Sequence, residues 1–234
     1  MTREIVFGRN AVREALRGRR EVLDLWVSER AAAALDWLGE GPRLRVVREE
    51  ELTEAAESPD HQGVVAWAQP YAYADPWALA SLEKPLLACL DQVTDPRNLG
   101  AVIRSAAGAG ATGVIVPAHG AARVTPAVCR SSAGAVEHLP VAVVPNLARY
   151  LAEIKRDDLW SYAADADATQ TMWQTDLTGG VALVFGAEGK GVRPLVRKTC
   201  DATVSIPLAP GVESLNVSVA AAVLLYEARR QRTP

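Results

Sequence analysis

The chain has 234 residues, of which 49% are hydrophobic and 23% are charged. This length allows one large α/β domain or a small domain with a medium one, and the composition excludes a largely disordered or fibrous protein. The formal net charge is −3, so no overall positive field attracts nucleic acid or an anionic membrane. Any binding to RNA therefore depends on a local group of basic residues.

The cysteines and histidines exclude several kinds of site. Three cysteines are present, Cys89, Cys129 and Cys200, and an odd number at wide spacing predicts reduced, buried thiols. The histidines are not at ligand spacing from them, so we expect no metal. The N-terminus lacks the apolar segment of a signal peptide, and no apolar run reaches the roughly 20 residues that span a membrane. We therefore expect a cytoplasmic protein without a membrane partner.

Short extended runs alternate with helical patterns over residues 1–70, which predicts a compact βαβαβαβ unit. The expected elements follow in chain order: 5–7, 10–17, 22–27, 31–38, 44–47, 50–56 and 64–67. The next stretch, Pro70 to Pro85, contains three prolines and has no clear period. It predicts a linker over residues 71–85 and a domain boundary there.

A second domain is expected over residues 86–234, because near-continuous apolar runs typical of buried parallel strands recur there. These runs are 86–90, 113–116, 139–144, 181–185 and 204–206. An apolar face predicts a helix over residues 98–109, with Asn98 near its N-cap. The last helix, residues 216–230, is apolar nearly all round, so we expect it to be buried in the domain or in a dimer interface.

One glycine pattern in this domain is misleading. Gly108 to Gly113 match the dinucleotide-binding pattern G-x-G-x-x-G by letters only. That site needs a strand before the glycines and a helix after them, whereas here a helix precedes and a strand follows. We interpret the segment as a helix C-cap and turn, which disfavours a nucleotide-dependent oxidoreductase.

Polar, glycine-containing loops follow three of the expected strands, at the edge where open α/β sheets place their ligands. They span residues 91–100, 186–191 and 206–218. Each loop alone has a plain structural interpretation as a turn or a helix N-cap, with Ser214 or Asn216 as the cap in the third loop. Their coincidence in one domain is what indicates a ligand site.

The second loop, Gly186–Gly191, indicates the kind of ligand. It is not a Walker loop, because Gly191 stands in place of the required Ser or Thr. Glu188 would repel a pyrophosphate but could hydrogen-bond sugar hydroxyls or lie near a cation. The loop therefore favours a ligand without phosphates.

Together the three loops resemble the three motifs of the SpoU, or TrmH-type, branch of the SPOUT RNA methyltransferases. The matching residues are Asp95, Pro96, Asn98, Gly100 and Arg104, then Phe185, Gly186, Glu188, Gly189 and Gly191, then Ile206, Pro207 and Ser214–Ser218. The resemblance covers residues 86–232. Residues 7–12 and 61–63 are similar to the L30e-like RNA-binding domain of members that act on ribosomal RNA. The whole chain is most similar to the enzymes that methylate a guanosine ribose in large-subunit rRNA.

The resemblance implies a SPOUT α/β fold. A parallel-sheet methyltransferase domain over residues 86–234, with a C-terminal trefoil knot, would follow a small L30e-like α/β domain over residues 1–70 that binds the RNA substrate. Such knots are rare among protein folds. The resemblance also implies a homodimer and S-adenosylmethionine as cofactor, a sulfonium cation without phosphate. The backbone around Gly186, Ile206 and Leu215 would bind this cofactor.

The implied reaction is methylation of a ribose 2′-hydroxyl in RNA. For a chain with this resemblance, the implied substrate is the ribose of a guanosine in 23S rRNA. Arg104 is the catalytic residue that the family implies. Because a guanidinium holds its proton tightly and makes a poor base, we expect Arg104 to clamp phosphate and hydroxyl, and the identity of the base stays open. Asn98, Glu188, Asn216 and Ser218 would orient the pocket and the ribose.

Two other functions stay open at this point: methylation of tRNA by the same catalytic domain, and a non-catalytic role as an RNA-binding ribosome assembly factor. The intact motif residues argue against the second. The RNA contacts of the first domain are also open. Its arginines could form one basic face, or a balanced surface with the interleaved Glu4, Glu14 and Glu21. These arginines are Arg3, Arg9, Arg13, Arg17, Arg19 and Arg20.

Overall fold

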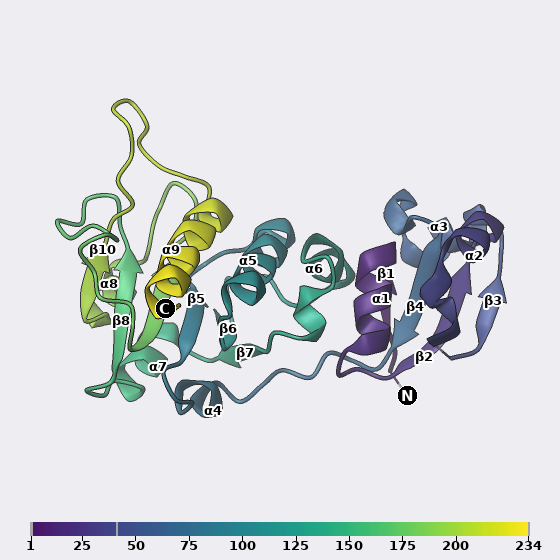
Figure 1. Ribbon diagram of the computed structural model, residues 1–234, viewed down its shortest axis with the longest axis horizontal. Coiled ribbons are helices and arrows are strands. Elements are labelled where there is room, and N and C mark those ends of the chain that lie inside the picture. Colours follow the sequence, from purple (N-terminus) through teal and green to yellow (C-terminus); the bar gives the residue numbers. More distant parts are fainter. Residues whose placement is uncertain (1, 41, 234) are drawn as a thin grey trace. The chain divides into compact units, whose positions relative to one another are not determined.

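The computed structural model describes residues 2–40 and 42–233. The chain forms two compact units (Figure 1). The first unit comprises Met1–Ala72 and Arg123–His138, and the second comprises Tyr73–Ala122 and Leu139–Pro234. Each unit is built on one sheet. No helix in the described part of the chain is long and apolar enough to cross a membrane.

The first unit contains a four-stranded sheet in the order β1-β4-β2-β3. Strand β4 is antiparallel to β1 and β2, whereas β2 and β3 are parallel. The predicted βαβαβαβ order is confirmed, although residues 31–38 form the end of one helix and a separate 3₁₀ turn because Leu35 is extended. The elements are β1 (Glu4–Phe7), α1 (Arg9–Arg17), β2 (Val22–Val27), α2 (Glu29–Ala34), η1 (Asp36–Glu40), β3 (Leu44–Val46), α3 (Glu49–Ala56), η2 (Pro59–His61) and β4 (Val64–Ala68).

Residues 123–138 come from the middle of the sequence but pack with the first unit. They form helix α6 (Pro126–Ser131) and turn η3 (Ala135–Glu137). Glu137 is 2% exposed and accepts a hydrogen bond from Nε of the buried Arg20 at 2.9 Å. Paired charges of this kind can remain buried in a folded protein. Arg20 is therefore not part of a basic face, and the expected range 86–234 includes a segment that packs with the first unit.

The second unit contains a six-stranded parallel sheet in the order β10-β8-β9-β5-β6-β7 (Figure 1). Every residue of β5, β6 and β9 is buried, as their near-continuous apolar sequences predict. Strand β8 was not predicted, because it mixes polar and apolar residues and Trp160 is 50% exposed. The strands are β5 (Leu86–Leu90), β6 (Gly113–Pro117), β7 (Val141–Val144), β8 (Leu159–Ala164), β9 (Gly180–Phe185) and β10 (Ala202–Val204).

Five helices belong to the described part of the second unit: α4 (Pro76–Ala80), α5 (Pro96–Ala109), α7 (Leu147–Glu153), α8 (Pro194–Thr199) and α9 (Val217–Arg232). Helices α5 and α9 pack against each other. Leu224 and Leu225 of α9 are buried, whereas Val219 and Tyr226 are 47% and 50% exposed. The last helix is therefore buried in its own unit on one side and exposes apolar side chains on another. Gly110 ends α5 in the left-handed conformation, which confirms the predicted C-cap.

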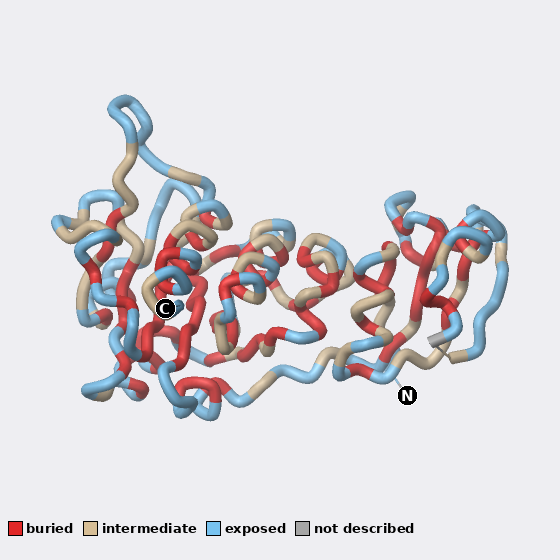
Figure 2. The backbone as a smooth tube through the Cα atoms, viewed as in Figure 1, coloured by how far each residue is buried: buried red, intermediate tan, exposed pale blue. Residues whose placement is uncertain are grey.

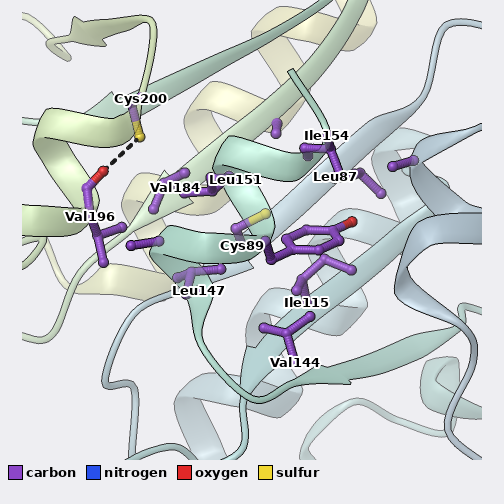
Figure 3. Packing of buried hydrophobic residues seen from close by; sticks show 14 of the residues in the cluster. Leu87, Cys89, Ile115, Val144, Leu147, Leu151, Ile154, Val184, Val196 and Cys200 are labelled. Carbon is purple, nitrogen blue, oxygen red and sulfur yellow. Dashed lines mark hydrogen bonds between the residues drawn. The ribbon is translucent and has the colours of Figure 1, made fainter. Parts of the chain in front are cut away.

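The hydrophobic core of the second unit includes part of the expected linker. Leu79 of α4 belongs to the same core as Tyr150, whose hydroxyl donates to the Pro76 carbonyl at 2.8 Å. A helix forms here because Asp75 caps it and Pro76 occupies its first turn, but it is too short to show a period in the sequence. Figure 3 shows other core members, including Leu87, Cys89, Ile115 and Leu151. All three cysteines are free and buried, as predicted.

Candidate active site

The three polar loops follow β5, β9 and β10. Because all strands of this sheet are parallel, their carboxyl ends lie at one edge of the second unit. Strands β5 and β9 are neighbours, so the loops that follow them are adjacent. The loop between β10 and α9 is exposed over residues 209–214 (Figure 2). The edge predicted from the sequence therefore carries all three loops.

Helix α5 begins in the first of these loops. Its N-cap is Asp95, whose carboxylate accepts a hydrogen bond from the Arg97 amide at 2.8 Å, and Pro96 occupies the first helical position. This corrects the expectation that Asn98 lies near the cap, since Asn98 lies inside the first turn. The Asn98 side chain is therefore not used to cap the helix and can contact other loops.

Asn98, Glu188, Asn216 and Ser218 form one hydrogen-bonded cluster, as the motifs predict for residues of a shared site. The Asn98 amide donates to Oε1 of Glu188 at 3.1 Å. The Asn216 amide donates to the same carboxylate oxygen and to Oδ1 of Asn98, the latter at 3.2 Å. The Ser218 hydroxyl donates to Oδ1 of Asn216 at 2.6 Å. The network thereby joins one side chain from each of the three loops, and Ser218 is linked to it through Asn216.

Glu188 is the charged member of this cluster. Both amides donate to its Oε1 atom, and no other described residue donates to its carboxylate. Hydrogen bonds to an ionised acceptor are stronger than neutral ones, so the two amides fix the orientation of the carboxylate. Oε2 is left to accept a hydrogen bond from a ligand hydroxyl.

Asn216 has a second role as the N-cap of α9. Its Oδ1 accepts a hydrogen bond from the Ser218 amide at 2.8 Å. Of the two cap candidates in the third loop, Asn216 and not Ser214 is therefore the cap. The start of α9 and the position of the cluster depend on the same side chain.

The loop between β9 and α8 folds back on itself. The Gly191 amide donates to the Ala187 carbonyl at 2.9 Å, and a Cβ atom on Gly186 would lie 1.9 Å from the Gly191 carbonyl carbon. Gly189 and Gly191 have φ values of +71° and +64°, which glycine adopts without strain. The glycines predicted to form a ligand loop are therefore required by its backbone.

A cavity of about 550 Å³ lies beside this loop. Gly186, Ile206 and Leu215, the three residues expected to bind the cofactor, all line it. This volume lies within the range of roughly 300–1,000 Å³ that is typical of small-ligand sites. The cavity is also lined by four carboxylates and by two cationic side chains, Lys190 and Arg197. The carboxylates are Asp165, Asp167, Glu188 and Glu213. An acidic lining of this kind suits a cationic ligand and disfavours phosphates.

The sequence did not indicate Asp165 and Asp167, because they follow the unpredicted strand β8. Arg197 forms an ion pair with Asp165 at 2.6 Å, which leaves Asp167 to add negative charge to the cavity. A pattern of three apolar residues before two acidic ones at 162–167 was the only signal available, and it is weak. The structure therefore adds a fourth polar segment, after β8, to the three loops predicted from the sequence.

A second, smaller cavity adjoins the first. Its volume is about 370 Å³, and its lining includes Thr94, Asp95 and Asn98 from the first loop. Glu188 and Lys190 line both cavities. The Asn98–Glu188 contact therefore lies where two ligands, one in each cavity, would meet.

Arg104 lies outside this cluster. It follows Asn98 by six residues, which turns it by about 240° around the helix. Its side chain is exposed, has no hydrogen-bond or ion-pair partner among the described residues, and lines neither cavity. The structure thus does not bring Arg104 into contact with the other predicted site residues of its own chain.

Asp91 anchors the first loop to the start of α8, a role that the sequence did not indicate. It is fully buried, and it accepts hydrogen bonds from the Arg193 backbone amide and Nε, each at 2.9 Å. The hydrogen bond to Asp91 raises the pKa of Arg193. This pair holds the start of the loop after β5 against the end of the loop between β9 and α8. No cluster of metal-ligating side chains occurs within residues 2–40 and 42–233.

Comparison with known families matches both parts of the chain. Residues 85–226 match the SpoU rRNA Methylase family, and residues 5–74 match the RNA 2′-O ribose methyltransferase substrate binding family. The chain is 41% identical over 240 residues to the 23S rRNA (guanosine-2′-O-)-methyltransferase RlmB of Pectobacterium atrosepticum, with 98% of each sequence covered. It is 41% identical over 198 residues to RlmB of Escherichia coli K12, covering 83% of this chain and 82% of the relative.

A solved structure has the same architecture. The SpoU methyltransferase AviRb from Streptomyces viridochromogenes, crystallised with the cofactor AdoMet, is similar with a TM-score of 0.84 and 29% identity. The similarity covers 98% of this chain and 90% of AviRb. The motif cluster, the family matches and these relatives agree, and the chain therefore belongs to the SpoU rRNA methylase family.

Proposed function

We propose that this protein methylates a ribose 2′-hydroxyl of RNA with S-adenosylmethionine, and that its substrate is a guanosine of 23S rRNA. The observation that carries the proposal is the Asn98–Glu188–Asn216 network at the junction of two cavities, one of which is lined by Gly186, Ile206 and Leu215. The guanosine and the 23S rRNA come from the names of the RlmB relatives.

The larger cavity is the site for the cofactor. The backbone around Gly186, Ile206 and Leu215 would hold its adenine and methionine portions, and the acidic lining would favour its positive charge. S-adenosylmethionine supplies an electrophilic methyl group on a sulfonium. The absence of a phosphate in this cofactor agrees with Glu188 in the loop, since a carboxylate there would repel one.

The residues of the chain act mainly by positioning. The smaller cavity would receive the target ribose, and Oε2 of Glu188 would accept a hydrogen bond from one of its hydroxyls. Asn98 and Asn216 hold that carboxylate in place. Correct placement of two reactants can lower a barrier by about 7–11 kcal/mol. Positioning alone can therefore account for much of the rate.

Arg104 would bind the RNA backbone beside the target nucleotide. No described residue pairs with its guanidinium, so it is available to an RNA phosphate. A guanidinium stays protonated under the conditions of a protein, so Arg104 clamps the substrate rather than removing a proton. Its separation from the cofactor cavity predicts that its loss affects methyl transfer and not cofactor binding.

Three further properties belong to this proposal. The first unit binds the RNA substrate, which the match of residues 5–74 to a substrate-binding family supports. The C-terminal part of the second unit forms a trefoil knot, and the chain is a homodimer in the cytoplasm. The exposed Val219 and Tyr226 on α9 support an apolar interface. Light scattering of the purified protein tests the dimer directly.

The test is transfer of a labelled methyl group from S-adenosylmethionine to total RNA from cells that lack the gene, with Arg104→Ala as control. Label in 23S rRNA that maps to one guanosine ribose and is absent with the variant is the expected result. Label in tRNA would keep the chemistry and refute the substrate. No label in any RNA, precursor ribosomal particles included, would favour a non-catalytic assembly factor.

A further inference from the structure

The first unit contains a polar cavity that the methyl-transfer site does not use. Its volume is about 710 Å³, large enough for a ligand of nucleotide size. Polar side chains from α1, α2, α3 and the turn after η2 line it, among them Arg9, Asn10, Arg30, Glu49 and Gln62.

His61 makes one wall of this cavity rigid. Its side chain is buried, its Nδ1 atom accepts a hydrogen bond from the Gly63 amide at 3.0 Å, and its Nε2 atom lies 3.0 Å from the Thr53 hydroxyl. Because Nδ1 accepts from a backbone N–H, the neutral ring carries its proton on Nε2. Both ring nitrogens are therefore used within the protein, and His61 supports the cavity without binding its ligand.

Gln62 extends into the cavity from a left-handed backbone position, with φ of +55°. Two hydrogen bonds hold it there: the Arg9 amide donates to Oε1 at 3.0 Å, and Nε of Arg9 donates to the Gln62 carbonyl at 3.1 Å. Non-glycine residues adopt this conformation at an energetic cost. The Gln62 side-chain NH₂ group is not used in these contacts and is available as a donor.

The remaining polar groups of the cavity are mostly donors. Arg30 and Asn10 are exposed, and neither side chain has a hydrogen-bond or ion-pair partner among the residues described. Arg9 uses only Nε and its backbone amide. Among the residues that the structure describes, Glu49 is the one carboxylate that lines the cavity, against two guanidinium groups. The cavity is therefore suited to an anion that also carries a hydrogen-bonding edge.

We propose that this cavity binds one unpaired nucleotide of the substrate RNA. Arg9 and Arg30 contact its phosphate, for which guanidinium groups are well matched, and Asn10, Gln62 and Glu49 contact the edge of its base. Proteins commonly read RNA through unpaired bases that leave the stack. This inference rests on the proposed function, because RNA is the expected ligand of this unit only if the protein modifies RNA.

The test measures equilibrium binding of transcribed, unmethylated 23S rRNA to the full chain without S-adenosylmethionine, over a series of salt concentrations. Arg30→Ala should weaken binding about tenfold and lower the salt slope by about 1, as expected for one lost phosphate contact. Arg19→Ala is the matched control, since Arg19 is an exposed arginine of the same unit that does not line the cavity. It should change affinity less than about twofold.

Asn10→Asp separates binding from folding. Asn10 lies in the first turn of α1, where a carboxylate favours the helix, so the thermal transition should not fall. RNA affinity should nevertheless drop, because the new charge repels phosphate. Equal effects of Arg30→Ala and Arg19→Ala, or normal RNA affinity of both Arg30→Ala and Asn10→Asp, would overturn the proposal.

Short oligonucleotides test the contact with the base. The full chain should bind a twelve-residue uridine oligoribonucleotide more tightly than the same backbone with abasic residues. Gln62→Glu, which keeps the acceptor for the Arg9 amide but removes the side-chain donor, should reduce this difference. Equal affinity for both oligonucleotides would show a phosphate contact alone and refute the nucleotide pocket. Methyl transfer by the unaltered protein, measured in parallel, separates failure of this inference from failure of the proposed function.

Discussion

Gly186→Ala tests whether the folded-back loop between β9 and α8 holds the cofactor. A Cβ atom at this position would lie 1.9 Å from the Gly191 carbonyl carbon and 2.1 Å from the Val192 nitrogen. Both are backbone atoms, so no change of rotamer relieves the overlap and the loop must open. Opening breaks the hydrogen bonds from the Lys190 and Gly191 amides to the Ala187 carbonyl.

The expected cost follows from these two bonds. At about 1 kcal/mol net for each, their loss makes the closed loop that the cofactor needs about 2 kcal/mol less stable relative to the open loop, which weakens binding about thirtyfold. Isothermal titration of the full chain with S-adenosylmethionine measures this directly. The thermal transition of the variant, recorded beside it, shows that the loss does not come from unfolding.

Gly189→Ala is the matched control in the same loop. Gly189 has φ of +71°, but no atom of the described part of the chain lies within 4 Å of an added Cβ. The variant therefore carries the strain of a left-handed alanine in the free and the bound states alike, and its affinity for the cofactor should stay within a few fold. If Gly186→Ala binds S-adenosylmethionine normally, or if both variants lose the same affinity, the loop does not act as argued.

Three further outcomes are expected. Arg104→Ala should abolish methyl transfer while calorimetry shows cofactor affinity within a few fold, and a parallel loss of cofactor binding would contradict a role in clamping RNA. Glu137→Gln should lower the free energy of unfolding in urea by about 1.5–3 kcal/mol, because it leaves the buried Arg20 without its main counter-charge; a change below about 0.5 kcal/mol would refute this. The hydrogen bond from Arg230 lowers the pKa of Glu227 from its ordinary value of 4.5. The ionised Glu227 side chain therefore stabilises the fold fully above about pH 4.5, and this stabilisation is lost as the pH falls through the lower pKa of the folded state. The melting temperature should therefore fall less steeply below pH 4.5 in Glu227→Gln than in the unaltered protein, and identical slopes would contradict the assignment.

The sheet edge and its loops were predictable from the sequence because their signals are local. Buried parallel strands give near-continuous apolar runs, and the loops after them carry the glycines and polar residues that a ligand site needs. Gly186 and Gly191 are examples, since the backbone of the folded-back loop requires them. The family motifs in these loops then identified the cluster members before their contacts were known.

Contacts between distant segments were not predictable in this way. Asn98 and Asn216 are 118 positions apart, and no periodicity indicates that their amides share one carboxylate. The N-cap of α5 was misplaced because Asp95 and Asn98 are both good caps, and only the backbone decides between them. Strand β8 was missed because Ser161 interrupts its apolar run, although this serine is buried and donates from its amide and hydroxyl to Asp201.

The path of the chain between the two units has a practical consequence for anyone who dissects this protein. The polypeptide passes from one unit to the other near residues 72, 122 and 138, so the first unit is discontinuous in sequence. A fragment that starts after residue 72 would retain α6 without the strand and helix that cover Val128 and Cys129, both buried in the whole chain. A transplant of the first unit into a relative must therefore carry two pieces of sequence, and a cut after residue 72 leaves that unit without residues 123–138.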